Sequence, residues 1–272
     1  MRAAKIASRL ASALGALAPA LQPLTRLSLR LDRSNPVASF AELNRRTGGE
    51  WGLKNVVFEK DPELFALFMQ YGLHQRAQIL QDLAYLKFFE AHPGEGFFVE
   101  VGVGDGTHLS NSHLFEKQFG WDGLLVEPNP AFHDRIRASR SASLETSAAF
   151  DSAGRMDFVC SGELSGLVAE TGRDHHRREG RIVAVPTATL TEIFQRHSVP
   201  ERIQFLSIDT EGAELNVLRG LDFSKYAVDF VAVEHNFDAA KRDAINRLMA
   251  DRGFRNVSSA AALWDDWFVR QA

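Results

Sequence analysis

The residues best suited to chemistry form a glycine-rich segment with two acids, Val-Glu-Val-Gly-Val-Gly-Asp-Gly at positions 99–106. Its glycines are Gly102, Gly104 and Gly106. Glycine tolerates positive φ and lets the backbone approach a ligand closely. The spacing is Gly-x-Gly-x-Gly, which differs from the Gly-x-Gly-x-x-Gly of dinucleotide sites. Glu100 and Asp105 would repel a pyrophosphate and suit a cationic ligand, such as a sulfonium with an α-amino group. The alternative is a tight strand-to-helix turn with incidental acids.

A further acid stands where a nucleoside ribose would bind. Glu127 and Pro128 follow the apolar run 123–126, about 20 residues after the glycine segment. An acid at this place accepts hydrogen bonds from ribose hydroxyls. An acid at this place is expected both in a site for a nicotinamide nucleoside and in a site for a sulfonium nucleoside. Glu127 therefore indicates a nucleoside ligand but does not distinguish these two kinds.

Polar side chains also follow two later apolar runs. Residues 203–208 lead into Asp209, and residues 230–233 lead into Glu234 and His235. Asp209 and Glu234 are candidate ligands for a hard divalent cation such as Mg²⁺, which would lower the pKa of a substrate hydroxyl. Alternatively, His235 acts as general base on that hydroxyl. The third interpretation is a hydrogen-bonded strand end without a chemical role.

Two more acids, Glu211 and Glu214, lie just beyond Asp209. With Asp209 facing the cleft, they would shape the cofactor or substrate site. Alternatively, they complement the positive end of the following helix. We expect the second role for at least one of them.

These residues must be positioned by alternating strands and helices. The expected strands are residues 97–101, 123–126, 143–148, 155–160, 182–185, 203–208, 230–233, 254–258 and 266–269. The expected helices are residues 110–119, 131–138, 190–196, 214–219 and 239–252. Such alternation predicts an α/β fold with a mainly parallel sheet and helices on both faces. Ligands bind beyond the carboxyl ends of strands in such sheets, where these acids lie.

Composition sets the broad class of protein. The chain has 272 residues, 45% of them hydrophobic and 24% charged, as in ordinary soluble proteins. A net charge of -4 gives no case for nucleic-acid binding. The lone Cys160 cannot form an internal disulfide. We expect a cytoplasmic protein whose oligomeric state the sequence leaves open.

The domain boundaries follow from changes in pattern. Residues 1–60 are expected to be a partly helical extension, and residues 61–272 the main domain. Within that domain, residues 61–95 are leading helices and residues 150–185 an insertion. An Asp-Pro pair begins the leading helices, with aspartate as N-cap and proline at the first helical position.

Two basic segments have no assigned role. Residues 1–31 are basic, but their apolar stretch is shorter than the ~20 residues that a membrane span needs. The segment is either a loosely packed helical extension or an amphipathic helix on an anionic membrane. The basic segment 172–181 is either a solvated loop or a lid for an anionic substrate.

Three motifs in order resemble the FkbM family of methyltransferases. They are residues 96–117, 120–130 and 206–220, preceded by the pair Gln81-Asp82. The resemblance covers about residues 79–270. It implies a Rossmann-like class I methyltransferase fold, with a seven-stranded, mainly parallel sheet and S-adenosylmethionine over the first two strands. It also implies O-methylation of a hydroxyl acceptor on a sugar, glycolipid or polyketide.

Site residues carry over from the resemblance motif by motif. Glu100, Gly102, Gly104 and Asp105 would line the methionine part of the cofactor, and Glu127 the ribose. The remaining expected cofactor contacts are Gly106, Pro128 and Asp209. Some other O-methyltransferases bind Mg²⁺ through acids at the places of Asp209 and Glu234. Two rival functions stay open, a nicotinamide-dependent oxidoreductase and a non-catalytic scaffold.

Overall fold

A computed structural model of the chain describes residues 60–72, 74–171, 178–259 and 261–271. The chain divides into two compact units, residues 1–73 with 259–261 and residues 74–258 with 262–272. The described part of the first unit contains helix α4 (Pro62–Tyr71), capped by Asp61, whose side chain accepts a hydrogen bond from the Leu64 amide. The predicted helix start at Asp61 is therefore confirmed, although α4 belongs to the first unit.

Residues 1–31, for which a membrane contact was one interpretation, lie outside the described residues. Within the described residues, no helix has the length and apolar character needed to span a membrane.

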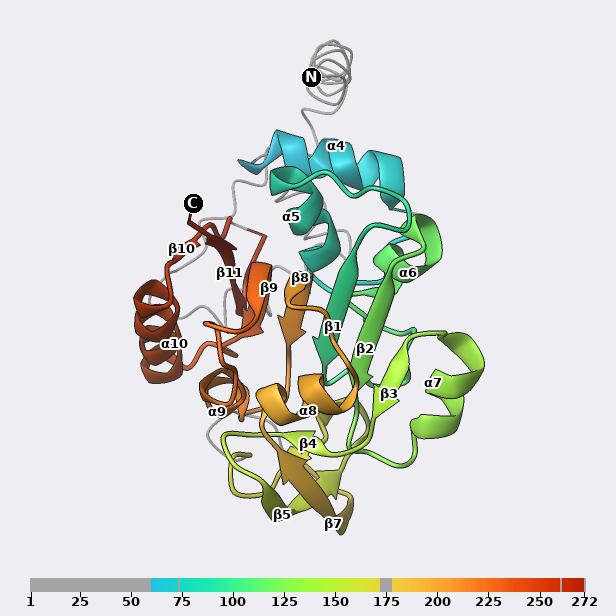
Figure 1. The fold of residues 1–272 in the computed structure, drawn as a ribbon, viewed down its shortest axis with the longest axis vertical. Coiled ribbons are helices and arrows are strands. Elements are labelled where there is room, and N and C mark those ends of the chain that lie inside the picture. Colours follow the sequence, from blue (N-terminus) through green and yellow to red (C-terminus); the bar gives the residue numbers. More distant parts are fainter. Residues whose placement is uncertain (1–59, 73, 172–177, 260, 272) are drawn as a thin grey trace, which may run out of the picture. The chain divides into compact units, whose positions relative to one another are not determined.

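The second unit is built on a seven-stranded sheet with the order β10-β11-β9-β8-β1-β2-β3 (Figure 1). Its strands are β1 (Phe97–Val101), β2 (Asp122–Val126), β3 (Ser143–Glu145), β8 (Arg202–Ile208), β9 (Ala227–Glu234), β10 (Phe254–Asn256) and β11 (Asp265–Arg270). Strand β11 is antiparallel to β9 and β10, and the other neighbouring pairs are parallel. The predicted Rossmann-like, mainly parallel sheet is confirmed.

Helices α5 to α10 belong to this unit. They are α5 (Gln81–Phe88), α6 (His113–Phe119), α7 (His133–Ser139), α8 (Leu190–Arg196), α9 (Glu214–Arg219) and α10 (Ala239–Asp251). A capping box begins α8, with Thr189 and Glu192 each bonding the other's backbone. Gly120 ends α6 in the left-handed conformation, with φ +63°.

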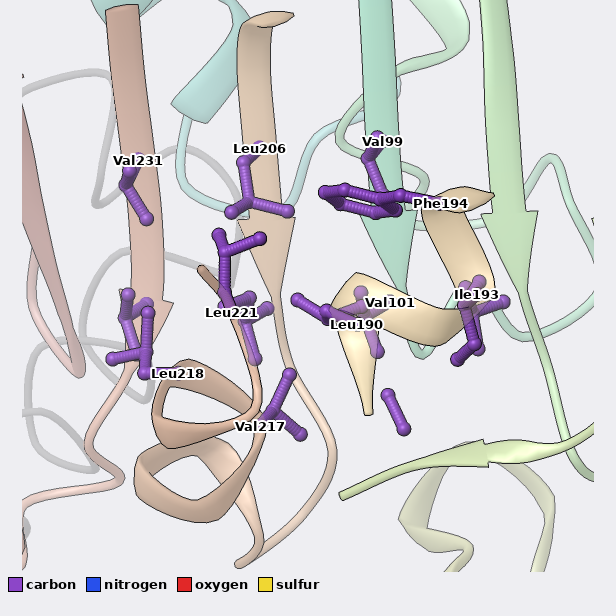
Figure 2. Close-up of a cluster of buried hydrophobic side chains, with 14 of the residues drawn as sticks. Val99, Val101, Leu190, Ile193, Phe194, Leu206, Val217, Leu218, Leu221 and Val231 are labelled. Carbon is purple, nitrogen blue, oxygen red and sulfur yellow. The ribbon is translucent and has the colours of Figure 1, made fainter. Parts of the chain in front are cut away.

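Alternate residues of the central strands point to opposite faces of the sheet, and each face has its own core. On one face, Val99 and Val101 of β1 pack with α8 and α9 (Figure 2). On the other face, Tyr85 of α5 makes edge-to-face contacts with Phe205 of β8 and Phe230 of β9. These layers hold the central strands rigidly, so the positions of their carboxyl ends are fixed.

The insertion forms a second sheet, which the sequence predicted only as separate strands. Its strands are β4 (Ala148–Ala149), β5 (Gly154–Cys160), β6 (Gly166–Leu167) and β7 (Arg181–Ala188), in the order β4-β7-β5-β6, with the 3-10 turn η1 (Gly162–Leu164) between β5 and β6. In Figure 1 this sheet lies beyond the carboxyl ends of β1 and β2. Gly166 lies so close to Glu211 that a Cβ there would be 3.4 Å from the Glu211 Cβ.

The helix expected over residues 110–119 begins later, at His113. Residues 110–112 instead hydrogen-bond to the carboxylate of Glu100, which holds them as an ordered loop. The apolar pattern alone could not reveal this competing set of bonds.

Candidate active site

The glycine segment and Asp209 meet at the carboxyl ends of β1 and β8. The Asp209 amide donates to the Val101 carbonyl at 3.0 Å. Gly102 has φ +84°, and a Cβ there would lie 1.7 Å from the Asp209 carbonyl oxygen. No residue with a side chain fits at this position, so Gly102 permits the two strand ends to approach.

Gly104, in the same segment, has free space beside its backbone. It has φ +60°, and a Cβ built there would have no heavy atom within 4 Å. Its amide donates to Glu127 Oε2 at 2.8 Å. The backbone at Gly104 therefore has open space beside it, while its N–H is fixed by an acid from the next strand.

Glu127 lies at the end of β2, as the sequence predicted, and is only 4% exposed. Its second oxygen, Oε1, accepts a hydrogen bond from the Asn129 amide at 2.8 Å. Burial raises the pKa of Glu127 to about 7, although the amides of Asn129 and Gly104 lower it. Each oxygen keeps a further lone pair, so the carboxylate can also accept bonds from two neighbouring hydroxyls. The next residue, Pro128, is partly exposed beside it.

Glu100 has a structural task that the sequence did not reveal. Its Oε1 accepts from the Asn111 amide at 2.7 Å, and its Oε2 accepts from both hydroxyls of Ser110 and Ser112, at 2.8 and 2.5 Å. Burial raises its pKa, and the charge of Arg140 lowers it. Glu100 thus holds the loop after the glycine segment, and its contact with a ligand stays a prediction.

Arg140, at the C-terminal end of α7, was missed by sequence reasoning. Its side chain is fully buried and forms a 2.7 Å ion pair with Glu116 of α6. The guanidinium also donates to the Gly106 carbonyl at 2.8 Å and to the hydroxyls of Ser110 and Ser112. Arg140 therefore supports the ligand loop from behind. The only signal in the sequence was a cation after α7, which is too common to interpret.

Asp105 stabilises the turn between the glycine segment and the following loop. Its Oδ1 accepts hydrogen bonds from the amides of Thr107 and His108, at 2.9 and 2.8 Å. Gly106, with φ +86°, packs against Ile136 and Arg140. Both residues shape the loop, and their direct contact with a cofactor stays a prediction.

Three carboxylates converge beyond β8 and β9. One oxygen from each of Asp209, Glu211 and Glu234 lies within 4.8 Å of the other two. Burial raises the pKa of Asp209 and Glu234 well above the ordinary values, and the neighbouring carboxylates raise them further. The predicted pair therefore lies together, and Glu211 joins it. Residue 211 adopts φ +58°, which turns the chain back toward Asp209.

Glu214 differs from Glu211, since its carboxylate is engaged in structural bonds to the turn before α9. Its Oε1 accepts from the amides of Thr210 and Gly212, at 3.0 and 2.8 Å, and its Oε2 pairs with Lys241 at 2.7 Å. Glu214 is wholly buried at the start of α9. The structural interpretation, which the sequence left open for at least one of these acids, fits Glu214.

His235 is less well placed for proton transfer than the sequence suggested. Its Nδ1 accepts a hydrogen bond from the Phe237 amide at 3.1 Å, so the neutral ring carries its proton on Nε2. Nε2 is buried and has no partner within the described residues. Burial lowers the pKa of His235 to about 4. In this arrangement the ring is neutral and has no free nitrogen that could accept a proton.

The pair Gln81-Asp82 reaches the same edge of the sheet from the start of α5. Gln81 donates to Oδ2 of Asp265, which pairs across the strands with Glu234. Asp82 is fully buried, and its Oδ2 has no partner within the described residues. Burial raises the pKa of Asp82 to about 8, and the charge of Glu100 also raises it. The pair was noted in the sequence without a role.

Of the predicted basic loop, residues 172–177 lie outside the described residues. Arg178 lies within them and pairs with Glu211 Oε2 at 2.7 Å. It also donates to the carbonyl of Leu164 in the insertion, at 2.8 Å. Arg178 therefore links the insertion to Glu211 of the carboxylate cluster.

Residues 100–256 match the model of the methyltransferase FkbM domain. No curated protein matches the sequence. Among solved structures, methyltransferase FkbM from Methylobacillus flagellatus KT is similar, with 13% identity and a TM-score of 0.47. The match covers 87% of this chain but only 59% of that one, so this chain spans little more than half of its length.

Two further solved structures are similar at lower TM-scores. A methyltransferase from Pyrococcus furiosus has 14% identity and a TM-score of 0.38, covering 71% of this chain and 82% of that chain. The ribosomal protein L11 methylase from Lactobacillus delbrueckii subsp. bulgaricus has 11% identity and a TM-score of 0.37, covering 71% and 78%.

The family match extends over more than half of the chain and includes residues 100–106 of the glycine segment, Glu127, Asp209 and Glu234. The same residues meet at one edge of a Rossmann-like sheet. The chain therefore belongs to the FkbM methyltransferase domain family.

Proposed function

We propose that this chain transfers a methyl group from S-adenosylmethionine to a hydroxyl oxygen of a small molecule, such as a sugar, glycolipid or polyketide. The observation that supports it most is the hydrogen bond between Gly104 and Glu127. It brings an accessible backbone segment and a buried acid together at the edge where nucleosides bind in such sheets.

The residues present suit S-adenosylmethionine. Open space above Gly104 leaves room for close approach, and Glu127 can accept bonds from ribose hydroxyls. Two buried acceptor atoms, Asn111 Oδ1 and Asp82 Oδ2, have no donor within the described residues. The backbone amide of Asn111 donates a hydrogen bond to Glu100, and the charge of Glu100 raises the pKa of Asp82. A ligand's ammonium group would supply a donor to Asn111 Oδ1 and would favour the ionised form of Asp82. S-adenosylmethionine supplies a methyl group on a positively charged sulfur.

The acceptor hydroxyl must lose a proton, and Asp209 and Glu234 are the better candidates to take it. Both carboxyls lie beyond the strand ends, and burial raises their pKa well above the ordinary values. A raised pKa makes a carboxylate a stronger base. His235 was the other candidate, but its Nδ1 is engaged by the Phe237 amide. The remaining contribution of the protein is to hold the hydroxyl in line with the methyl group.

The rival functions differ in what they predict. Membership of the family counts against a nicotinamide-dependent oxidoreductase. A non-catalytic scaffold would bind the cofactor and transfer nothing. Burying acids lowers the free energy of unfolding, and a scaffold would bear this cost without using the acids in a reaction. Seven acids at this edge are buried or partly buried: Asp82, Glu100, Glu127, Asp209, Glu211, Glu234 and Asp265.

Two measurements test the proposal. Calorimetric titration should show binding of S-adenosylhomocysteine and none of NAD, and the reverse result would establish the oxidoreductase. Incubation with methyl-labelled S-adenosylmethionine and fractionated cell extract should then label a small hydroxyl compound. Asp209→Asn serves as the inactive control. Binding without label in any fraction would support the scaffold instead.

A further inference from the structure

Helices α9 and α10 lie side by side, and a cavity of about 350 Å³ opens between them (Figure 1). Its lining includes Asn216 and Arg219 of α9 and Lys241 of α10. Gly212 and Asn236, from the turns after β8 and β9, line it as well. We call this cavity the α9–α10 groove. Its volume falls within the roughly 300–1,000 Å³ of small-molecule pockets.

The α9–α10 groove adjoins the carboxyls proposed to take the proton of the acceptor. Gly212 is three residues after Asp209, and Asn236 is two residues after Glu234. Because consecutive Cα atoms are about 3.8 Å apart, these two lining residues lie within roughly 11 Å and 8 Å of the two acids. The groove is therefore within reach of a ligand whose hydroxyl lies at the carboxyls.

The polar groups of the groove include both hydrogen-bond donors and acceptors. The carboxamides of Asn216 and Asn236 each offer both kinds. Asn216 Oδ1 accepts from Arg219 at 3.2 Å, and the side chain of Asn236 makes no hydrogen bond within the described residues. Arg219 is exposed, so its other N–H donors are available to a ligand.

Charges of both signs line the groove. Arg219 and Lys241 are cations, whereas Glu170 and Asp238 are acids. The Lys241 ammonium also pairs with Glu214 at 2.7 Å, which compensates its charge. An anionic ligand such as a phosphate would be repelled by these acids as well as attracted by the cations. The lining therefore favours a neutral ligand.

The apolar part of the lining is small. It consists of Leu215, Ala240 and Ala244. A polyketide or an acyl chain gains its binding energy by leaving water for apolar surface, which is scarce here. A sugar ring instead carries hydroxyls that each donate and accept, and its C–H groups can pack on a few apolar side chains. The lining therefore fits a carbohydrate.

We infer that the α9–α10 groove binds the sugar part of the acceptor through the side chains of Asn216, Arg219 and Asn236. The inference rests on the proposed function and narrows its acceptor to a carbohydrate or glycolipid. The hydroxyl to be methylated lies at Asp209 and Glu234, and the adjoining sugar lies between the two helices.

Sugar binding is measured without cofactor, on an array of immobilised glycans probed with the fluorescently labelled full chain. We expect retention by a subset of glycans, reversed by the same glycan in solution. Asn236→Gly and Arg219→Ala should each weaken retention about tenfold, because each removes hydrogen bonds to the ligand. Glycine suits position 236, where φ is +47°. The control is Arg247→Ala, an exposed arginine of α10 outside the lining.

A second measurement separates a ligand contact from a structural role. Asn236→Gly and Arg219→Ala should bind S-adenosylhomocysteine with the wild-type affinity, because neither residue lies in the glycine segment or beside Glu127. With the acceptor found by methyl labelling, each should raise KM about tenfold and change kcat little, as expected when binding is lost equally from substrate and transition state.

The inference is overturned if no immobilised glycan retains the wild type. It is equally overturned if both folded variants are retained like the wild type, or if mass spectrometry finds no sugar in the methylated molecule. The last result would leave methyl transfer itself established. If no molecule is labelled, the methyl-transfer proposal fails, while retention on the array is unaffected.

Discussion

The Gly104 amide donates to Glu127 Oε2 at 2.8 Å and so joins two motifs that are 23 residues apart in the sequence. One motif is the turn after β1 and the other is the end of β2, which pairs in parallel with β1. Because this bond sets the place of a carboxylate relative to an accessible backbone segment, it determines which ligand the edge of the sheet can hold.

Replacing Glu127 should weaken cofactor binding more than it weakens the fold. Glu127→Gln keeps an oxygen for one amide but loses the charge and one strong acceptor. A hydrogen bond to a charged group contributes about 1.5–3 kcal/mol, so the affinity for S-adenosylhomocysteine should fall about 10- to 100-fold. Calorimetric titration measures this, and far-ultraviolet circular dichroism checks the fold. Unchanged affinity in a folded variant would remove Glu127 from the site.

Two neighbouring glycines should respond differently to alanine. Gly102→Ala places a Cβ 1.7 Å from the Asp209 carbonyl, so the strand ends must separate and the protein should lose several kcal/mol of stability. Gly104→Ala meets no atom within 4 Å and costs only about 1–2 kcal/mol for its positive φ. It should nevertheless abolish S-adenosylhomocysteine binding, because the methyl group fills the ligand's space. Equal stability of the two variants in urea would contradict this distinction.

Arg140 should matter for stability, because it supports the ligand loop from behind. Arg140→Ala leaves Glu116 and the hydroxyls of Ser110 and Ser112 without their buried partner. Removing one member of a buried ion pair costs about 3–5 kcal/mol, which chemical unfolding can measure. The matched control is Arg137→Ala on the same helix, whose ion pair is exposed and whose loss should be near neutral. If both variants unfold alike, Arg140 does not support the loop.

The protein should lose stability as the pH rises from 6.5 to 8. Burial raises the pKa of Asp82 to about 8, and those of Glu127 and Asp265 to about 7. In this window the folded state binds more protons than the unfolded state, so the free energy of unfolding falls with pH. Each such proton changes it by about 1.4 kcal/mol per pH unit.

The window begins at pH 6.5 because two histidines act in the opposite sense below it. Burial lowers the pKa of His113 and His235 to about 4, so their contribution to stability grows with pH only up to their unfolded value of 6.5. Asp82→Asn should flatten the decline above pH 6.5, measured by thermal unfolding at several pH values. The exposed Asp151→Asn is its control. A variant with the wild-type slope would show that Asp82 does not titrate there.

Removal of His235 should leave the chemistry largely intact. His235→Asn should change kcat only a few-fold, whereas Asp209→Asn should lower it about 100-fold or more if a carboxylate takes the proton. The measurement uses the acceptor found by methyl labelling. The opposite order of effects would restore His235 as the general base.

The sequence by itself determined the elements and the order in which they occur. Strand β1, helix α8 and helix α9 begin and end at the residues expected from the apolar pattern of the sequence. These signals are local, because a strand or a cap depends on residues a few positions apart. The acids after β2, β8 and β9 could also be predicted to share one edge, since parallel strands end together.

Only the tertiary structure decided what each acid does. Glu100, Asp105 and Glu127 are all acids after or within strand ends, yet Glu100 holds a serine-rich loop and Asp105 closes a turn. Glu211 joins Asp209 and Glu234, whereas Glu214, three residues later, holds the turn before α9 through the Thr210 and Gly212 amides. The support from Arg140 and the fixed tautomer of His235 were likewise invisible in the sequence. Such roles depend on which donors surround a side chain, and those donors come from segments far away along the chain.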